Sequence, residues 1–183
     1  MTTRARAALA AVALLVAAGC LGSLPGSPGS SPAENRTATV VDVVDGDTVD
    51  VRFADGTEDT VRLLGVDTPE VYADNSPAEF EGVPDTEAGR SCLRSWGERA
   101  GEYARDRLAG ETVTVALDPE SDRRGGYDRL LAYVYVDDES FNRALVESGY
   151  ARLYDTEFGA RDDYAALERR AREHGTGLWS CAA

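Results

Sequence analysis

The chain of 183 residues contains no lysine and a single histidine, His174. A mechanism that needs a pair of histidines is therefore excluded, and a serine triad would have to use His174. With one histidine and three widely spaced cysteines, a structural zinc site is not expected either. The sequence also lacks a glycine-rich phosphate-binding loop. The chemistry that remains is that of carboxylates and arginines.

All 19 basic residues are arginine, and they stand against 33 acidic residues. Without Arg4 and Arg6, which lie in the leader described below, 17 arginines against 33 acids give a net charge of −16. A surface this acidic repels a polyanion, so a nucleic-acid site would have to be a local arginine patch. An acid-rich composition without lysine also predicts a salt-loving source, where salt screens the repulsion over about 3 Å at 1 M.

Residues 1–19 have the composition of a signal peptide. Arg4 and Arg6 precede an apolar run that is too short for a membrane span and ends in small residues before Cys20. This ending is typical of a lipobox, which predicts lipidation of Cys20 and a membrane anchor on the extracellular face. The alternative is an ordinary signal peptide with an incidental cysteine, and a secreted protein. Residues 20–36, rich in glycine, serine and proline, predict a flexible tether, and residues 37–183 form one domain.

The cysteine count fits this prediction, because lipidation of Cys20 leaves Cys92 and Cys181 as an even pair. Outside the cytoplasm these two residues are able to form a disulfide. Such a bridge would close most of the domain and stabilise it by roughly 4 kcal/mol. The alternative is two unrelated free thiols.

Hydrophobic patterns divide the domain into short strands and three helices. Strands are predicted at residues 39–44, 48–53, 60–66, 112–117 and 130–136. Helices are predicted from the apolar stripe between Leu93 and Leu108, after Ser140, and over residues 161–174. Five short strands, of which the first three form a meander, favour a small barrel. Residues 71–91, which are rich in acids, are predicted to be a solvated loop. The alternatives are a lid over the site or an additional set of metal ligands.

The stretch Val61–Glu70 is an apolar strand that ends in acids. Arg62 lies inside this strand, and a buried guanidinium needs an anionic partner. Pro69 has no amide hydrogen for strand pairing, so Asp67 and Glu70 are expected at the rim of the sheet. Rims of sheets are common places for functional sites.

A second acidic stretch, Asp45-Gly46-Asp47, lies between two β-branched runs. Taken alone, an Asp-Gly pair between alternating apolar residues is typical of a hairpin turn. In combination with Asp67 and Arg62, it predicts carboxylates for a hard cation beside an arginine for an anion.

Five motifs occur in the order that one known family shows. They are Asp45-Gly-Asp-Thr-Val49, Arg62-Leu-Leu-Gly-Val-Asp-Thr-Pro-Glu70, Tyr127-Asp-Arg-Leu-Leu-Ala-Tyr-Val-Tyr135, Asn142-Arg-Ala-Leu-Val146 with Gly149, and Gly177-Leu-Trp-Ser180. Over about residues 37–181 the chain resembles the thermonuclease, or staphylococcal nuclease-like, family of calcium-dependent nucleases. The resemblance implies an α+β, mainly β fold with a five-stranded OB-fold barrel and three helices in the order β-β-β-α-β-β-α-α.

The same resemblance implies a metal site and a base. Asp47, Asp67 and the main-chain carbonyl of Thr68 would bind Ca²⁺, with waters and a phosphate oxygen at the remaining positions. Glu70 would orient or deprotonate the attacking water. Taken alone, Glu70 would be a surface acid after a proline.

Substrate contacts are implied in the same way. Arg62 and Arg129 would clamp the scissile phosphate, because a planar guanidinium suits bidentate phosphate contact. Tyr127 would lie near that phosphate. Taken alone, Arg129 would be a solvated residue at the start of a strand, and Tyr127 a packing residue.

The chain departs from the family pattern at several positions. The second substrate-facing tyrosine of the family aligns poorly and falls on Tyr154 or Asp155. Asp128 stands where the family usually has glycine, and Gly126 replaces a basic residue that would meet the substrate. Arg123 or Arg124 is expected to compensate, and Arg124 is taken as the predicted substrate contact. These changes concern affinity more than chemistry.

The resemblance therefore predicts an exported nuclease that uses Ca²⁺, hydrolyses phosphodiester bonds of DNA and RNA, and leaves 3′-phosphate ends. It is expected to be a monomer, and no protein partner is inferred. One alternative is a catalytically weak nucleic-acid-binding OB module on a lipoprotein anchor. Another is a structural lipoprotein whose acidic loop binds calcium. The enzyme is favoured because its five chemical side chains are all present: Asp47, Arg62, Asp67, Glu70 and Arg129.

Overall fold

The computed structural model of the protein describes residues 34–182. The predicted signal peptide, the lipidation site Cys20 and residues 20–33 of the predicted tether lie outside the described residues, and these assignments stay predictions. Strand β1 spans Asn35–Val43, so regular structure begins two residues before the predicted boundary at residue 37. Within residues 34–182, no helix has both the length and the apolar character needed to cross a bilayer.

The described residues form strands, three α-helices and three short 3-10 helices. The long strands are β1, β2 (Thr48–Phe53), β3 (Glu58–Leu63), β5 (Thr112–Ala116) and β6 (Leu130–Val136). The short strands are β4 (Val66–Asp67), β7 (Glu139–Ser140) and β8 (Arg152–Leu153). The helices are α1 (Glu87–Leu108), α2 (Phe141–Glu147) and α3 (Arg161–Glu173), and the 3-10 helices are η1 (Pro77–Glu79), η2 (Gly126–Asp128) and η3 (Gly177–Ala182).

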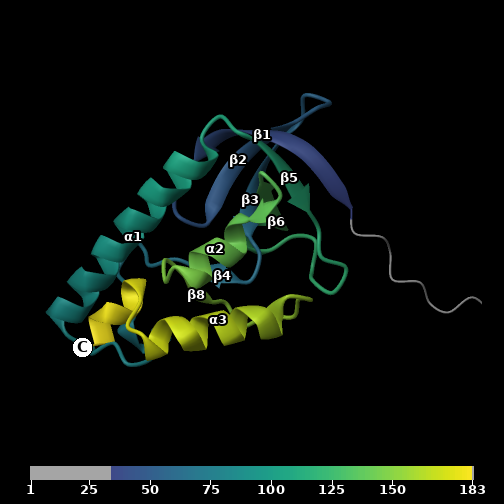
Figure 1. The fold of residues 1–183 in the computed structure, drawn as a ribbon. Coiled ribbons are helices and arrows are strands. Elements are labelled where there is room, and N and C mark those ends of the chain that lie inside the picture. Colours follow the sequence, from purple (N-terminus) through teal and green to yellow (C-terminus); the bar gives the residue numbers. More distant parts are fainter. Residues whose placement is uncertain (1–33, 183) are drawn as a thin grey trace, which may run out of the picture.

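The five long strands close into a barrel, with α1 along one side of it and α3 at the end away from β1 (Figure 1). The strands pair in the order β3-β2-β1-β5-β6, and the parallel pair β3–β6 joins the two ends. Residues 35–37 belong to β1 because they pair with β5, which the sequence did not reveal. The predicted α+β, mainly β fold with a five-stranded OB-fold barrel and three helices is confirmed.

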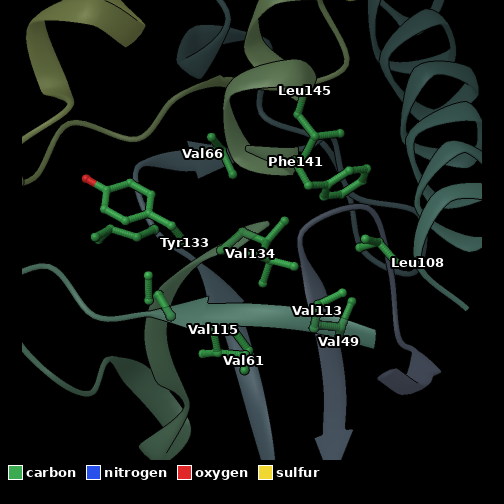
Figure 2. Packing of buried hydrophobic residues seen from close by; sticks show 14 of the residues in the cluster. Val49, Val61, Val66, Leu108, Val113, Val115, Tyr133, Val134, Phe141 and Leu145 are labelled. Carbon is green, nitrogen blue, oxygen red and sulfur yellow. The ribbon is translucent and has the colours of Figure 1, made fainter. Parts of the chain in front are cut away.

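The main core fills this barrel. Figure 2 shows apolar side chains of β2, β3, β5 and β6, such as Val49 and Val61, packed with Phe141 of α2 and Leu108 of α1. All four are almost completely buried, and burial of one such side chain is worth about 1.5–3 kcal/mol. A second, smaller cluster lies where the start of α1 meets η3 and contains Trp179.

One predicted strand is divided by a turn, so the prediction of a single strand over residues 60–66 is wrong. β3 ends at Leu63, and β4 begins at Val66 after Gly65, whose φ is +75°. An added Cβ on Gly65 would lie 2.4 Å from the ring of Phe158, so both the backbone and the space require glycine. The apolar pattern hides this turn because the residues on both sides of it are buried.

The first helix begins earlier than predicted. α1 starts at Glu87 and not at Leu93, because the side chain of Thr86 accepts a hydrogen bond from the amide of Gly89 and caps the helix. The loop predicted over residues 71–91 is therefore shorter, and residues 71–86 are called the 71–86 segment below.

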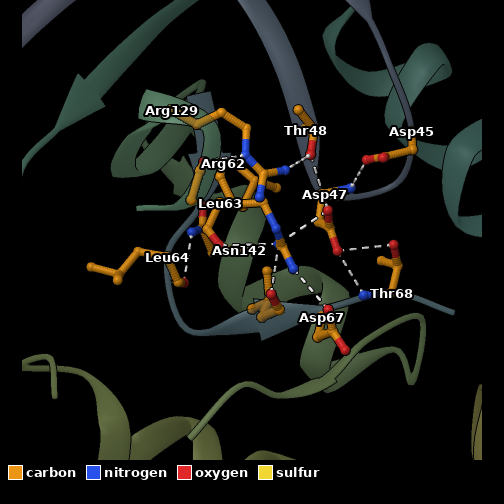
Figure 3. Close-up of polar contacts among 12 residues, drawn as sticks. Asp45, Asp47, Thr48, Arg62, Leu63, Leu64, Asp67, Thr68, Arg129 and Asn142 are labelled. Atoms are coloured by element: carbon orange, nitrogen blue, oxygen red, sulfur yellow. Dashed lines mark hydrogen bonds and ion pairs between the residues drawn. The ribbon is translucent and has the colours of Figure 1, made fainter. Parts of the chain in front are cut away.

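Asn142 ties helix α2 to the barrel beside this turn. Its side chain is fully buried, accepts a hydrogen bond from the amide of Val134 at 2.9 Å, and donates to the carbonyls of Leu64 at 3.0 Å and Ala132 at 3.2 Å. Leu64 is the residue after β3, so this contact fixes the path of the chain into β4 (Figure 3). The acids that follow β4 are placed by this connection.

Candidate active site

A polar hollow of about 440 Å³ lies among the β1–β2 turn, the end of β3, the loop before β6 and the residues after β8. Six of the predicted site residues line it: Asp47, Arg62, Asp67, Glu70, Arg124 and Arg129. They come from segments far apart in the sequence, which only the closed barrel brings together. Thr68 and Tyr127 do not line the hollow, although Thr68 contacts Asp47.

The β1–β2 turn delivers Asp47 to the hollow. An added Cβ on Gly46 would lie 2.8 Å from atoms of both Ala100 and Thr68, so the tight turn requires glycine there. Asp45 accepts a hydrogen bond from the amide of Asp47 at 3.1 Å. Oδ2 of Asp47 accepts hydrogen bonds from the amide of Thr68 at 2.7 Å and from its hydroxyl at 3.0 Å (Figure 3). The buried Asp47 carboxylate is thus fixed by the residue that follows Asp67.

Arg62 projects from β3 between two carboxylates (Figure 3). Its Nη1 lies 3.0 Å from Oδ1 of Asp47, and its Nη2 lies 2.8 Å from Oδ1 of Asp67. Nη1 also donates to the carbonyl of Val66 at 2.8 Å. The structure therefore supplies the anionic partners that an arginine within an apolar strand requires.

Asp67 is held from its other side by Arg152. The short strands β4 and β8 are antiparallel, and Asp67 lies opposite Arg152 in their register. Nη2 of Arg152 is 2.8 Å from Oδ2 of Asp67 and 2.9 Å from Oε2 of Glu79. Each carboxylate oxygen of Asp67 thus has one guanidinium partner.

The chemistry of these groups fits a hard cation. Burial, together with the charge of Asp47, raises the pKa of Asp45 to about 6, and burial raises the pKa of Asp67 despite the opposing effect of Arg62. Burial makes the negative charge of these carboxylates unfavourable, and a bound cation would offset that cost. Carboxylate oxygens are suitable ligands for Ca²⁺ and similar ions. In the described part of the chain, no three His, Cys, Asp or Glu side chains form a group able to hold a metal ion. Water, main chain or substrate would have to complete the coordination.

Arg129 lies directly before β6 and faces the same hollow. Its Nε donates to the carbonyl of Gly126 at 3.1 Å, and its Nη1 lies 3.5 Å from the hydroxyl of Thr48. No carboxylate among residues 34–182 forms an ion pair with it. Arg129 therefore differs from Arg62, because its guanidinium is available to an anion that enters the hollow.

Glu70 is exposed and lines the hollow beyond Asp67. Its main chain is held by Asn75, which accepts a hydrogen bond from the Glu70 amide and donates one to the Glu70 carbonyl, both at 2.8 Å. Asp47, Asp67 and Glu70 thus line one hollow together with Arg62 and Arg129.

The sequence matches the family model of staphylococcal nuclease homologues over residues 60–181. The chain belongs to this family. It is 38% identical over 154 residues to an uncharacterised protein of Methanocaldococcus jannaschii, covering 80% of this chain and 73% of that protein.

Several relatives of this staphylococcal nuclease homologue have names that state an activity, among them a thermonuclease and an endonuclease. The thermonuclease of Staphylococcus hyicus is 30% identical over 156 residues, which cover 84% of this chain and 82% of the relative. The endonuclease YncB of Bacillus subtilis is 32% identical over 159 residues, which cover 85% of this chain and 67% of the relative. The resemblance seen in the five motifs is confirmed by these matches.

Two predicted substrate contacts of this family member are placed less favourably. Arg124 lines the hollow, but its Nη1 and Nη2 lie 3.1 and 2.6 Å from the carboxylate oxygens of Asp59. The Tyr127 side chain is 96% exposed, and its φ is +59°; the guanidinium carbon of Arg129 lies 5.6 Å from the centre of its ring. Asp128 has a φ of +60°, which agrees with a position where the family usually has glycine.

Arg152, Glu79 and Asn75 were missed by the sequence analysis. β8 is only two residues long, so no periodic signal placed Arg152 opposite Asp67. Asn75 and Glu79 lie in the stretch predicted to be a solvated loop. The one available signal was their closeness in sequence to Glu70.

Proposed function

We propose that this protein is a metal-dependent nuclease that hydrolyses phosphodiester bonds of nucleic acid in the polar hollow. The observation that carries the proposal is the meeting of Asp47, Asp67, Glu70, Arg62 and Arg129 around one cavity. Membership of the staphylococcal nuclease homologues supports it, as do the nuclease activities in the names of the two relatives. The finer proposal, which rests on the family resemblance, is that the enzyme uses Ca²⁺, acts on DNA and RNA, and leaves 3′-phosphate ends.

In this proposal Asp47 and Asp67 hold the cation, with the main-chain carbonyl of Thr68 as a further ligand. A bound cation of this kind supplies positive charge beside the phosphate oxygens. Thr68 has a second task, because its amide and hydroxyl fix Oδ2 of Asp47 and leave Oδ1 directed at Arg62.

Arg129 makes the first contact with the phosphate. Its guanidinium has no carboxylate partner among residues 34–182, and a planar fork suits two phosphate oxygens. Arg62 also binds phosphate, but its pairs with Asp47 and Asp67 have to open for this contact. Negative charge that develops on the phosphate during attack is thus met by fixed positive groups.

Glu70 accepts the proton of the attacking water. Glu70 lines the hollow, and its carboxylate makes no hydrogen bond or ion pair within residues 34–182, so it is free to bind a water molecule. A positioned general base contributes about 10²- to 10⁴-fold to a rate.

The test is the release of acid-soluble nucleotides from single-stranded DNA by the purified protein, in Ca²⁺, in Mg²⁺ and in chelator. We expect cleavage in Ca²⁺ that falls by about 10²- to 10⁴-fold in a Glu70→Gln variant. The matched control is Glu111→Gln, which neutralises an exposed glutamate away from the hollow. Activity that survives in chelator would contradict the proposed need for a metal ion. Activity that survives in the Glu70→Gln variant would contradict the proposed role of Glu70 as the base.

The alternative function, a nucleic-acid-binding OB module, predicts a different result. A fluorescent oligonucleotide would then bind, as measured by anisotropy, but no product would form in any metal. An Arg129→Ala variant separates the two functions further, since a nuclease should lose turnover in it more than affinity.

A further inference from the structure

The 71–86 segment is more closely packed than its composition suggests. Its acids are exposed, as the prediction of a solvated loop requires. Four of its other residues are buried: Asn75, Pro77, Phe80 and Val83. Because buried residues are spread along it, the segment is packed against the rest of the protein.

Contacts with α1 and with the second core cluster hold the segment. An added Cβ on Gly97 would lie only 2.3 Å from the carbonyl oxygen of Pro69. Glycine at this position of α1 therefore permits the close approach of the chain that leads into the segment. Arg94 donates to the carbonyl of Val71, and also to that of Ala73 at 3.2 Å. Further along, Phe80 and Val83 pack in the cluster that contains Trp179.

Asn75 is the polar residue that this packing buries, with 6% of its surface exposed. Its Oδ1 accepts from the Glu70 amide and its Nδ2 donates to the Glu70 carbonyl, each at 2.8 Å. Two residues in an antiparallel sheet exchange hydrogen bonds in the same way, so the side chain of Asn75 replaces a neighbouring strand. It holds both main-chain polar groups of one residue.

The position of Glu70 depends on these two hydrogen bonds, because no other hydrogen bond or ion pair within the described residues holds its side chain. Its carboxylate makes no hydrogen bond or ion pair there, and Glu70 is the third residue after the end of β4, with Pro69 directly before it. The position of its side chain relative to the hollow therefore depends on the orientation of its main chain. A misplacement of about 1 Å in a reacting group is able to cost about 100-fold in rate.

We infer that Asn75 is a positioning residue for Glu70, and that the 71–86 segment is a fixed part of the active site. The inference rests on the proposed role of Glu70 as the base. Asn75 does not touch the substrate; it fixes the Glu70 main chain so that the carboxylate stays beside the attacking water.

The test compares steady-state kinetics of the native protein with Asn75→Ala, Asn75→Asp and the double variant Asn75→Ala/Glu70→Gln, in Ca²⁺ and well below each melting temperature. In Asn75→Ala we expect kcat to fall about 10- to 100-fold, with KM changed less than about twofold. Asn75→Asp retains the acceptor for the Glu70 amide but not the donor, so its loss should be smaller.

In the double variant we expect no further loss beyond that of Glu70→Gln alone, because no base is left to position. The matched control is Asp106→Ala, which removes an exposed acidic side chain of α1 away from the hollow and should leave kcat unchanged. Circular dichroism monitors folding, and if Asn75→Ala does not fold, the comparison with Asn75→Asp decides.

A purely structural role for Asn75 predicts a lower melting temperature with unchanged kcat, or equal losses with and without Glu70; either result overturns the inference. Failure of the proposed function looks different, since Glu70→Gln itself would then keep full activity. A loss in Asn75→Ala that depends on the presence of Glu70 supports the inference.

Discussion

Arg62 and Arg129 face one hollow, yet their surroundings give them different properties. Arg62 is bound by Asp47 and Asp67, so it keeps two negative groups together in the protein as it stands. Replacing Arg62 would leave the charges of Asp47 and Asp67 without this partner, and an unpaired charge that is partly buried destabilises the fold. Arg62 is therefore important for folding as well as for binding the substrate. Within residues 34–182, the hydrogen-bond partners of the Arg129 guanidinium are a carbonyl and a hydroxyl, so its loss should affect function more than stability.

Asp45 gives a prediction on pH dependence. Its pKa in the folded protein is raised from 3.8 to about 6, mainly by burial, so the folded state binds its proton more tightly than the unfolded state. Its charge therefore destabilises the metal-free protein above about pH 6, and this cost is relieved as the pH falls towards 4. In chelator, Asp45→Asn should raise the melting temperature by a few degrees at about pH 8 and leave it unchanged near pH 4.

The control for this measurement is Asp106→Asn, which neutralises an exposed acid on α1. It should show no comparable difference between the two pH values. An Asp45→Asn variant that is stabilised equally at both would contradict the assigned cause.

At the scale of elements, the disulfide joins the start of α1 to η3. Cys92 and Cys181 are bonded, and their positions are 89 apart in the sequence. The bridge lies in the second core cluster, which also holds the 71–86 segment through Phe80. A structural disulfide suits an oxidising compartment, which agrees with the predicted export.

Loss of this disulfide should lower the free energy of unfolding by about 4 kcal/mol, because a bridge across so long a loop restricts the unfolded chain. The measurement is urea unfolding of the native protein and of a Cys92→Ser/Cys181→Ser variant, each with and without reductant. Reductant should destabilise only the native protein. Equal stability of all four samples would show that the bridge contributes nothing.

The whole molecule carries a large excess of acids, with 17 arginines against 33 acids from residue 20 onward. Most described ion pairs involve exposed side chains, as in Arg123–Glu34 and Arg161–Asp155, and exposed pairs contribute little stability. The net repulsion among the remaining acids therefore acts against folding. It also keeps nucleic acid away from all surfaces other than a local arginine site.

Sodium chloride should consequently stabilise the fold. We expect the melting temperature to rise between about 0.1 and 1 M salt, because the screening length falls from about 10 Å to about 3 Å. Oligonucleotide binding should weaken over the same range, since its electrostatic drive is lost. Thermal unfolding followed by circular dichroism measures the first effect; a falling melting temperature would mean that the surface ion pairs outweigh the repulsion.

Much of the fold was determined by the sequence alone. Alternating apolar residues located the five barrel strands, and the spacing of Leu93, Ala100 and Leu108 located the first helix, because burial of one face produces these periods. Asp45-Gly46-Asp47 predicted the β1–β2 turn through its local chemistry. The same motifs, by their resemblance to a family, indicated which side chains to look for in a site.

The tertiary structure decided what distant segments do to one another. Gly65 divides a strand because the ring of Phe158, far along the chain, occupies the space for any side chain. Arg152 reaches Asp67 through the register of two very short strands, and Asn75 becomes a partner of Glu70 only because its segment packs on α1. The pattern of apolar residues along a segment shows which face of a strand or helix is buried. The contacts of Gly65, Arg152 and Asn75 depend on closure of the barrel and on packing between distant segments, and the periodicity within one segment contains no information about them.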